Sequence, residues 1–425
     1  MRVLLSAFSC QPGRGSEPGV GWGVVSQAAL RHQIVVLTDA HNRPAIEQER
    51  ALTPLSQASF VYLGLPSVYR WAGKSKCSGY LYYFLWQLWA LRVARKLHRE
   101  HPFDLVHHVT FVNSWAPSFL GRLGIPFVWF AGAKEHTPIR FYRVLSWRAR
   151  ITEALRSLAV AGMGWLNLRW TAVRASVVVT SSPERVWPAR LTVERQPVGA
   201  LGEEEMVALG GLPIRKGGPF RMASIGQLNG GKGLVMGMRA FVRLLETHPE
   251  SEYWIVGDGP ERKRLERLAH ELRCAHRVQF LGWVPRSEIP ALLAQVDVLV
   301  HPSLHEQFGY VVLEAMAAGR VVLVTDVGGC GPLAKSGCGV VIPLESPEQV
   351  TAELHKALLR LVWDGGHRLR AAQAARKAAE ELWSWAAAGS RLEQIYQQAA
   401  GLPPRNPCGW REQRLPRRVE RQNAR

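Results

Sequence analysis

The chain has 425 residues, and 47% of them are hydrophobic. This length suits two domains of about 200 residues each, and the composition excludes a largely disordered protein. The net charge of +19 is concentrated in residues 1–200, where 24 Lys and Arg face 10 Asp and Glu, a net of +14. The first half is therefore expected either to meet an anionic partner, such as a phospholipid surface, a lipid phosphate or nucleic acid, or to present an ordinary solvated basic surface.

Cysteine usage and hydropathy bear on the compartment. Six cysteines are scattered without a C-x-x-C pair, which indicates free thiols in a reducing compartment rather than a disulfide framework or a zinc site. The opening segment MRVLLSAFSC has too short an apolar run for a signal peptide and is read as a first strand. No stretch offers about 20 uncharged apolar residues, so we expect a cytoplasmic protein without a membrane span.

Strands and helices alternate along residues 1–200. Helical periodicity occupies the stretches between apolar runs, and this alternation predicts a Rossmann-like domain with a parallel sheet covered on both faces. The apolar runs predict strands at Val3–Phe8, Ile34–Thr38, Phe103–His107, Pro126–Phe130 and Ser176–Thr180. The helical patterns include Trp22–Arg31, Leu85–Arg99 and Ile151–Leu158.

A second alternation follows a predicted linker at residues 201–219, which is rich in Gly and Pro and carries three consecutive Glu. It predicts a second Rossmann-like domain over 220–385. Residues 386–400 are expected to form a helix that crosses back to the first domain, and 401–425 a disordered basic tail. The strands are predicted at Arg221–Ile225, Glu252–Val256, Val278–Leu281, Val296–Val300 and Val321–Thr325, followed by an Ala-rich helical region over 347–399.

The strongest chemical signal is HPSLHEQFGYVVLEAMAAG at residues 301–319. A strand ends near Val300, and a helix is predicted from about Gly309 to 318. The first-turn N–H groups of a helix are unsatisfied and the dipole is positive there, so a diphosphate can dock at its start. Glu314 lies roughly 7 Å further along the axis, which is about the span from a diphosphate to its ribose. Glu306, on the other side of the helix start, can hold sugar hydroxyls.

A second signal is IGQLNGGKG at residues 225–233, between a predicted strand and a helix. Gly226, Gly231 and Lys232 approximate a phosphate-binding P-loop. In such loops a Ser or Thr hydroxyl binds Mg²⁺, but the corresponding residue here is Gly233. The loop therefore lacks the metal ligand that an ATPase needs. A glycine-rich turn with one lysine still makes a diphosphate site.

The first loop, Gly13–Gly23, is also glycine-rich and leads into a helix, so its backbone can approach a ligand closely. It holds no strict G-x-G-x-x-G, which disfavours a hydride-transferring enzyme. The six Asp form no D-x-D pair, the pattern with which metal-dependent glycosyltransferases usually hold a diphosphate. A lysine and a helix dipole need no metal.

These residues resemble the retaining glycosyltransferases of family four, the glycosyl transferases group 1, which have the GT-B fold of two Rossmann-like domains facing a central cleft. The resemblance covers nearly all of residues 1–400. It is most specific in GQLNGGKG, in VGDGP at 256–260, in FLGWVP at 280–285 and in the 301–319 segment. The GSEPGVGW loop and the HHVTF segment are similar to a branch common in bacterial exopolysaccharide and cell-surface glycan clusters.

The resemblance implies a role for each matching residue. Glu306 contacts the donor sugar, Glu314 holds the ribose, Phe308 and Gly309 offer backbone N–H groups, and Lys232 neutralises the leaving diphosphate. The other implied residues are Gly226, Gln227, Gly257 and Val284 on the donor side, Gly15, Gly19 and Gly21 in the facing loop, and His107 or His108 as the cleft histidine.

The chain departs from the family pattern in a few places. Gln227 stands where the family usually has Arg, which replaces a bidentate cation by a neutral amide. Gln307 replaces the usual Gly of E-G-F-G, and Pro332 stands where a Glu often follows. For the histidine pair at 107–108, a satisfied strand-end residue is as good an interpretation as a cleft residue.

The resemblance further implies a metal-independent reaction without a cofactor, in which the second domain binds a nucleotide-sugar and the first binds a glycan or lipid-phosphate-linked acceptor. Configuration is expected to be retained by same-face attack, with the leaving phosphate as base. The apolar stretch Tyr80–Leu91 and the basic, aromatic stretch Arg140–Arg156 either lie on the inner face of an anionic membrane or belong to buried helices.

Two other classes of function stay open. A nucleic-acid-binding protein is suggested by charge and would bind DNA or RNA in a salt-sensitive way, although no recognition motif supports it. A catalytically silent sugar-nucleotide-binding protein is suggested by Gln227, and it would bind donor without transferring it. The sequence alone does not name the donor sugar, its base or the acceptor.

Overall fold

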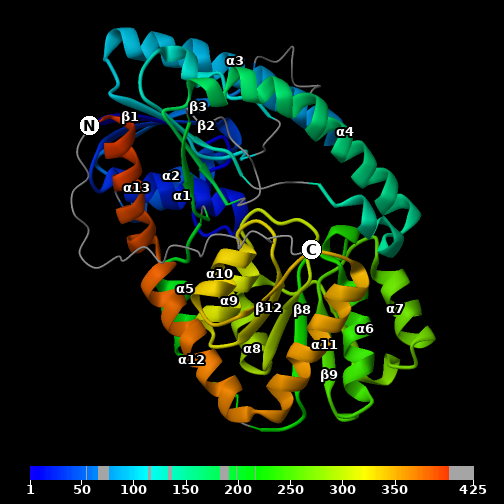
Figure 1. The fold of residues 1–425 in the computed structure, drawn as a ribbon. Coiled ribbons are helices and arrows are strands. Elements are labelled where there is room, and N and C mark those ends of the chain that lie inside the picture. Colours follow the sequence, from blue (N-terminus) through cyan, green and yellow to red (C-terminus); the bar gives the residue numbers. More distant parts are fainter. Residues whose placement is uncertain are drawn as a thin grey trace, which may run out of the picture.

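The computed structural model describes residues 1–53, 55–65, 76–112, 116–132, 136–181, 191–197, 199–215 and 217–401. Within these ranges the chain forms two parallel sheets, each covered by helices, with the first domain above the second in Figure 1. This confirms the α/β class expected from the two alternations. The predicted tail at 401–425 lies, apart from Gly401, outside the described residues.

The first sheet has the strand order β3-β2-β1-β4-β5-β6-β7 over the described residues. Alternate side chains of β1 enter different cores, as the period of two requires: Val3 and Leu5 pack with α1, whereas Leu4 packs with α3 on the opposite face. The strands are β1 (Arg2–Ser6), β2 (Gln33–Asp39), β3 (Ala58–Leu63), β4 (Leu105–His108), β5 (Phe127–Phe130), β6 (Val177–Thr180) and β7 (Thr192–Arg195), and the helices are α1 (Ser16–Ala29), α2 (Arg43–Leu52), α3 (Lys76–Glu100) and α4 (Trp147–Trp170).

The second sheet has the order β10-β9-β8-β11-β12-β13 in the described part of the chain. Helices α6 and α11 share one core, and α9, α10 and α12 share another. The strands are β8 (Arg221–Ile225), β9 (Glu252–Val256), β10 (Val278–Gly282), β11 (Val298–His301), β12 (Val321–Thr325) and β13 (Val340–Ile342), and the helices are α6 (Leu234–Leu245), α7 (Arg262–Glu271), α8 (Ile289–Ala294), α9 (Tyr310–Ala317), α10 (Cys330–Ser336), α11 (Pro347–Trp363) and α12 (Gly365–Leu382).

The chain passes between the domains at one paired crossing. The backbone N–H of Leu201 donates to the carbonyl of Trp383 at 3.0 Å, and that of Trp385 donates to Leu201 at 3.2 Å. Between Leu201 and β8, in the stretch predicted as a linker, lies the helix α5 (Glu203–Gly210). The two passages are therefore held side by side by backbone hydrogen bonds.

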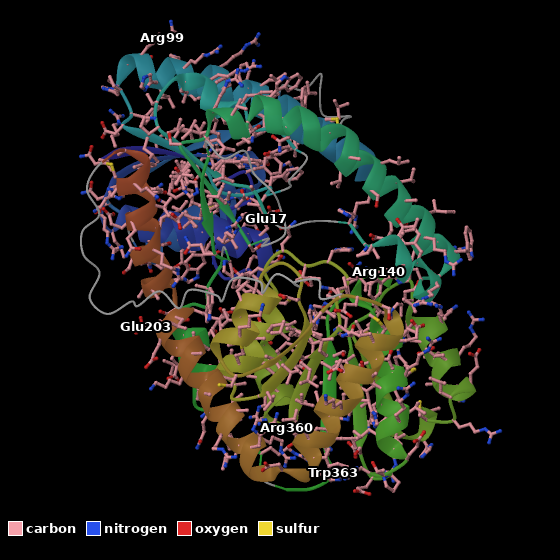
Figure 2. The ribbon with its side chains drawn as sticks, viewed as in Figure 1. Glu17, Arg99, Arg140, Glu203, Arg360 and Trp363 are labelled. Carbon is pink, nitrogen blue, oxygen red and sulfur yellow. The ribbon has the colours of Figure 1, made fainter. Side chains whose placement is uncertain are left out.

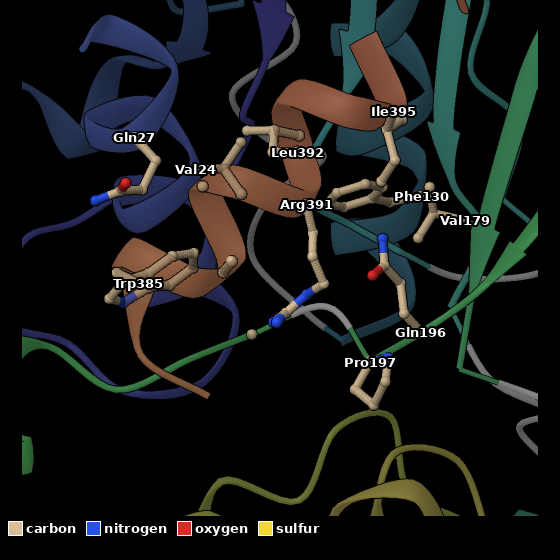
Figure 3. Close-up of a pocket in the computed structure, with 13 residues that line it drawn as sticks. Val24, Gln27, Phe130, Val179, Gln196, Pro197, Trp385, Arg391, Leu392 and Ile395 are labelled. Atoms are coloured by element: carbon tan, nitrogen blue, oxygen red, sulfur yellow. The ribbon is translucent and has the colours of Figure 1, made fainter. Parts of the chain in front are cut away.

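The last helix, α13 (Trp385–Ala399), packs on the first domain against α1, β5 and β6. A Cβ at Gly23 of α1 would lie 2.0 Å from the Trp385 ring, and one at Gly389 would lie 2.3 Å from Gln27. These two glycines let the helices approach closely. Figure 3 shows Trp385 and Leu392 of α13 facing α1, around a small cavity at this contact.

A second connection between the domains is made by the short helix η4 (Ile139–Val144) and α4. Phe141, Val144 and Leu145 are buried in a core that otherwise belongs to the second domain. In Figure 1, α4 runs from the neighbourhood of α7 back to the first domain. We call η4 and α4 together the arm, and Figure 2 labels Arg140 at its lower end. Apolar burial thus anchors a first-domain segment on the second domain.

Candidate active site

A cleft of about 740 Å³ lies between the domains, at the carboxyl ends of the strands. The loops after β4, β8, β10 and β11 contribute to its walls, together with the start of α1. Such crevices are where open α/β sheets bind ligands. Eight of the residues to which the resemblance assigns a role line this cleft, namely Gly226, Gln227, Lys232, Val284, Glu306, Phe308, Gly309 and Glu314.

The start of α9 is fixed by its glycine. Gly309 has φ +88°, a conformation that side chains rarely adopt, and a Cβ there would lie 2.6 Å from the Cys330 sulfur. The preceding Phe308 is buried, and its ring packs on Gly199 and on Tyr310. The backbone N–H groups at the helix start are therefore held in place beside the cleft, where an anion can accept from them.

Beside this helix start, Lys232, Glu306 and His301 form one cluster. The Lys232 ammonium donates to Glu306 Oε2 at 2.5 Å, and Nε2 of His301 lies 3.1 Å from the same oxygen. The His301 side chain is 4% exposed, whereas those of Lys232 and Glu306 are about one-fifth exposed. A lysine from the loop after β8 and a carboxylate from the loop after β11 thus meet at the cleft surface.

The electrostatics of the cluster keep the carboxylate charged and the imidazole neutral. Burial raises the pKa of Glu306, but the hydrogen bond from His301 and the Lys232 charge outweigh it and hold that pKa well below its usual range. Burial lowers the pKa of His301, although Glu306 opposes this. The cluster therefore offers one cation and one anion to a ligand near neutral pH.

The geometry of the lysine loop explains why it lacks the hydroxyl of a P-loop. Lys232 ends a short helical turn, and Gly233, at φ +63°, precedes α6. A Cβ at Gly233 would lie 2.1 Å from the carbonyl oxygen of Pro302. Ser or Thr does not fit there, because the β8 and β11 loops pass too closely.

Glu314 lies on the second turn of α9 and meets an arginine that the sequence did not single out. Arg286 Nη2 lies 3.1 Å from Glu314 Oε1 and 2.7 Å from Glu205 Oε1. Burial raises the pKa of Glu314, and the Arg286 charge offsets part of that effect. Arg286 therefore joins α5, the loop after β10 and α9 at one point, and it orients the carboxylate that faces the cleft.

Four of the glycines that the resemblance places at the site, Gly15, Gly19, Gly21 and Gly257, do not line the cleft and instead allow close packing. The Arg286 guanidinium rests on Gly15, where a Cβ would lie 1.6 Å from Nη1. Cβ atoms at Gly19 and Gly21 would each lie 2.1 Å from a backbone oxygen, and one at Gly257 would lie 2.0 Å from the Gly226 oxygen. In the first-domain loop the neighbouring Ser16, Glu17 and Val20 line the cleft instead.

The two strand-end histidines lie away from the cleft, contrary to the role expected of one of them. His107 and His108 are 0% and 1% exposed, and the cleft is lined by later residues of that segment, Val109 and Val112. Nδ1 of His107 lies 2.7 Å from the Tyr396 hydroxyl on α13. Burial lowers the pKa of His108 to about 4 and that of His107 well below its usual range. Both imidazoles are thus neutral core groups.

Several residues that shape the cleft were missed from the sequence. The Glu17 carboxylate accepts from the N–H groups of Phe111 and Val112, which holds the loop after β4. His305 lines the cleft and pairs at 3.3 Å with Glu153 of α4. These contacts join segments about 95 and 150 residues apart, so spacing carries no sign of them. His301 and His305 do stand inside the quoted HPSLHEQ string.

Comparison with known proteins bears on what the cleft does. The family model described as glycosyl transferases group 1 matches residues 213–378. The chain is 30% identical over 328 residues to 2-deoxystreptamine glucosyltransferase of Streptomyces kanamyceticus, which covers 72% of this chain and 81% of that protein. The chain belongs to the group 1 glycosyltransferases. Another relative of this glycosyltransferase is D-inositol 3-phosphate glycosyltransferase of Corynebacterium jeikeium, 32% identical over 206 residues, 46% of this chain and 47% of that protein.

Solved structures agree on the fold of the glycosyltransferase. Sucrose-phosphate synthase of Thermosynechococcus elongatus superposes with a TM-score of 0.59 at 17% identity, over 93% of this chain and 98% of the other. A structure from E. coli titled trehalose-6-phosphate bound with UDP-2-fluoro glucose gives a TM-score of 0.65 at 12% identity, over 95% and 100%. At identities this low, the comparison shows that the fold is GT-B but does not identify the substrate.

We also searched the described residues of the glycosyltransferase for membrane-spanning helices and for clusters of metal-binding side chains. Among the described residues, no helix is long and apolar enough to cross a bilayer. Within the same ranges, no three His, Cys, Asp or Glu side chains come together in a way that would hold a metal ion.

Proposed function

We propose that the glycosyltransferase moves a sugar, with retained configuration, from a nucleotide-diphosphate sugar to a glycan or lipid-phosphate-linked acceptor. One observation carries this proposal: Lys232, Glu306 and the start of α9 meet at one wall of the cleft, with Glu314 one and a half turns further along the helix. A diphosphate at the helix start has its ribose at Glu314 and its sugar at Glu306.

The chemistry then follows from the charges. The acceptor hydroxyl oxygen attacks the anomeric carbon from the face on which the diphosphate leaves, and the leaving phosphate oxygen takes the hydroxyl proton. The C–O bond to phosphate breaks as the new glycosidic bond forms. Lys232 and the α9 N–H groups stabilise the negative charge that grows on the diphosphate, so these residues need no metal for that step.

The first domain supplies the acceptor side of the cleft. Glu17 and Val20 of α1 and the loop after β4 face the donor site across the cleft. The net charge of +14 in residues 1–200 supports an acceptor that carries phosphate. We place the enzyme in bacterial surface polysaccharide synthesis, on the cytoplasmic side of the membrane.

A panel of UDP-, GDP- and ADP-sugars tests donor binding. We expect one base to raise the thermal unfolding midpoint of the wild type, and Glu314→Ala to weaken that donor's affinity about 10- to 100-fold, because charge-assisted hydrogen bonds to the ribose are lost. Glu353→Ala, at an exposed position of α11, is the matched control and should bind donor like the wild type. If Glu314→Ala and the wild type bind the donor with equal affinity, Glu314 does not contact the ribose.

A silent sugar-nucleotide-binding protein is the second candidate, because Gln227 lines the cleft where a cation is usual in the family. The two candidates separate in a transfer assay with the donor that binds. Release of nucleoside diphosphate in step with a glycosylated product supports the enzyme. Tight donor binding with no product from any acceptor tested supports the silent binder.

A further inference from the structure

The outer face of α4 carries an exposed apolar stripe. Trp147, Ile151, Leu155 and Leu158 are 67%, 53%, 63% and 70% exposed. Their spacing of four, four and three residues places them on one side of the helix, along roughly 17 Å of its axis. These four residues are called the α4 stripe below.

The inner face of the same helix is charged, which reverses the usual pattern of a surface helix. Glu153 is buried and accepts from the Thr137 hydroxyl at 2.8 Å. Arg156 Nη1 lies 3.3 Å from Glu153 and 2.6 Å from Nε2 of His305, which lines the cleft. Burial raises the pKa of Glu153, but His305 and Arg156 outweigh it and lower that pKa to about 2. An ionised carboxylate therefore faces inward while the large apolar side chains face solvent.

The segment that carries the stripe is itself packed on the second domain. Just before α4, Phe141, Val144 and Leu145 are buried in the core of the second domain. The arm is anchored there by further polar contacts, including the Arg264 guanidinium donating to the Val144 carbonyl at 3.0 Å. The apolar residues of η4 are thus buried, whereas those of the α4 stripe are exposed. Exposed apolar patches of this kind mark interaction sites.

The charge around the stripe indicates what covers it. Residues 139–174 contain seven Arg, and their one acidic residue is the inward-facing Glu153. Arg148 and Arg150 are exposed and flank the stripe, and the Arg148 guanidinium lies 5.2 Å from the Trp147 ring centre. A two-fold contact through this face would place the arginines of both copies in one interface. Anionic headgroups complement them.

We propose that the α4 stripe docks on an anionic phospholipid bilayer. Its apolar side chains enter the interface, and Arg148 and Arg150 contact lipid phosphates. The opposite face of α4 reaches the cleft wall at His305, so docking brings the cleft beside the lipid surface. The delivery of a lipid-linked acceptor to the cleft depends on the proposed function. The docking itself does not depend on it.

The other aromatic stretch considered from the sequence is a poorer candidate. Within Tyr80–Leu91, the side chains of Tyr83, Trp86 and Leu91 are buried in the core of the first domain. The large apolar side chains that this stretch does expose, Leu81, Leu88 and Trp89, are 41%, 39% and 36% exposed, less than any member of the α4 stripe. The structure therefore directs the test to α4.

Co-sedimentation of the full chain with vesicles tests the docking. The probes are phosphatidylcholine vesicles and vesicles with 30 mol% phosphatidylglycerol. We expect binding to the anionic vesicles that weakens with salt, and at least about tenfold weaker partitioning for Leu155→Glu/Leu158→Glu. The matched control is Leu52→Glu/Val207→Glu, at positions 76% and 70% exposed on α2 and α5, which should bind like the wild type. Unfolding midpoints of both variants should stay near that of the wild type.

Four results would overturn the docking proposal. They are no binding of the wild type to anionic vesicles, unchanged binding of the stripe variant, an equal loss in the control variant, and conversion of a dimer to a monomer by the stripe variant without loss of vesicle binding. The assay contains neither donor nor acceptor. A protein that docks but transfers no sugar would therefore contradict the proposed function and leave the docking intact.

Discussion

Replacing Lys232 with alanine is expected to lower kcat for sugar transfer about 10²- to 10³-fold, the usual cost of removing one preorganised group that stabilises a developing anion. The Lys232 ammonium is held within 2.5 Å of Glu306 beside the start of α9. It is thereby fixed before the donor arrives, so little reorganisation is needed as charge builds on the leaving diphosphate. Steady-state kinetics at saturating donor measure the effect.

The matched control for that experiment is Lys335→Ala. Lys335 lies on α10 of the same domain and pairs with Asp326 at the surface, where its side chain is 49% exposed. This variant should keep kcat within about twofold of the wild type. If Lys232→Ala also keeps kcat within that range, the leaving diphosphate does not lie against Lys232, and the assignment of the cluster fails.

Glu306→Gln is expected to lower kcat by about 10²-fold or more. The amide keeps the shape of the side chain but removes the charge that holds Lys232 and accepts from His301. The donor sugar loses the carboxylate that orients its hydroxyls, and Lys232 is left without its partner as the reaction proceeds. Initial rates over a range of donor concentrations separate the effect on kcat from that on KM.

Two comparisons make the Glu306 experiment specific. Glu266→Gln changes a partly exposed glutamate on α7 that pairs with Arg262, and it should leave the kinetics unaltered. Because Lys232 and Glu306 touch, their effects should not add. The double variant is expected to lose no more than about tenfold beyond Lys232→Ala. Full additivity would show that the two side chains act on separate parts of the donor.

The sequence predicted the central strands well because they are apolar on both faces. The ranges expected for β8, β9 and β12 coincide with the observed bounds, and all three are mostly buried. It missed β3, β7 and β13, which lie at sheet edges. TVER in β7 is only partly buried and carries two charged residues, so its apolar signal is weak, whereas the edge strand β10 was predicted.

The long Ala-rich region shows a different limit. It was expected as a helical region over 347–399 with a last helix at 386–400, and it forms α11, α12 and α13, the last of which begins at Trp385. The breaks fall at Asp364 and Ser384, whose side chains accept from the backbone of the helices that follow. Both are standard capping residues, so the sequence itself marks these two helix starts.

The residues that we propose to bind the donor could be located because they belong to short local sequence motifs. Lys232, Glu306 and Glu314 each belong to a motif whose strand-loop-helix context could be recognised, and all three line the cleft. Arg286 and Glu153 were not predictable, because their partners lie on other elements far along the chain. His107 misled because a polar residue at a strand end can equally be satisfied inside the core, here by Tyr396.

A crystal structure of the enzyme with the nucleoside diphosphate of the donor that binds tests the central claim most directly. We expect phosphate oxygens within about 3 Å of the Lys232 ammonium and of the N–H groups at the start of α9, with the ribose hydroxyls on Glu314. A nucleotide bound elsewhere in the cleft, or one whose phosphates point away from α9, would contradict it.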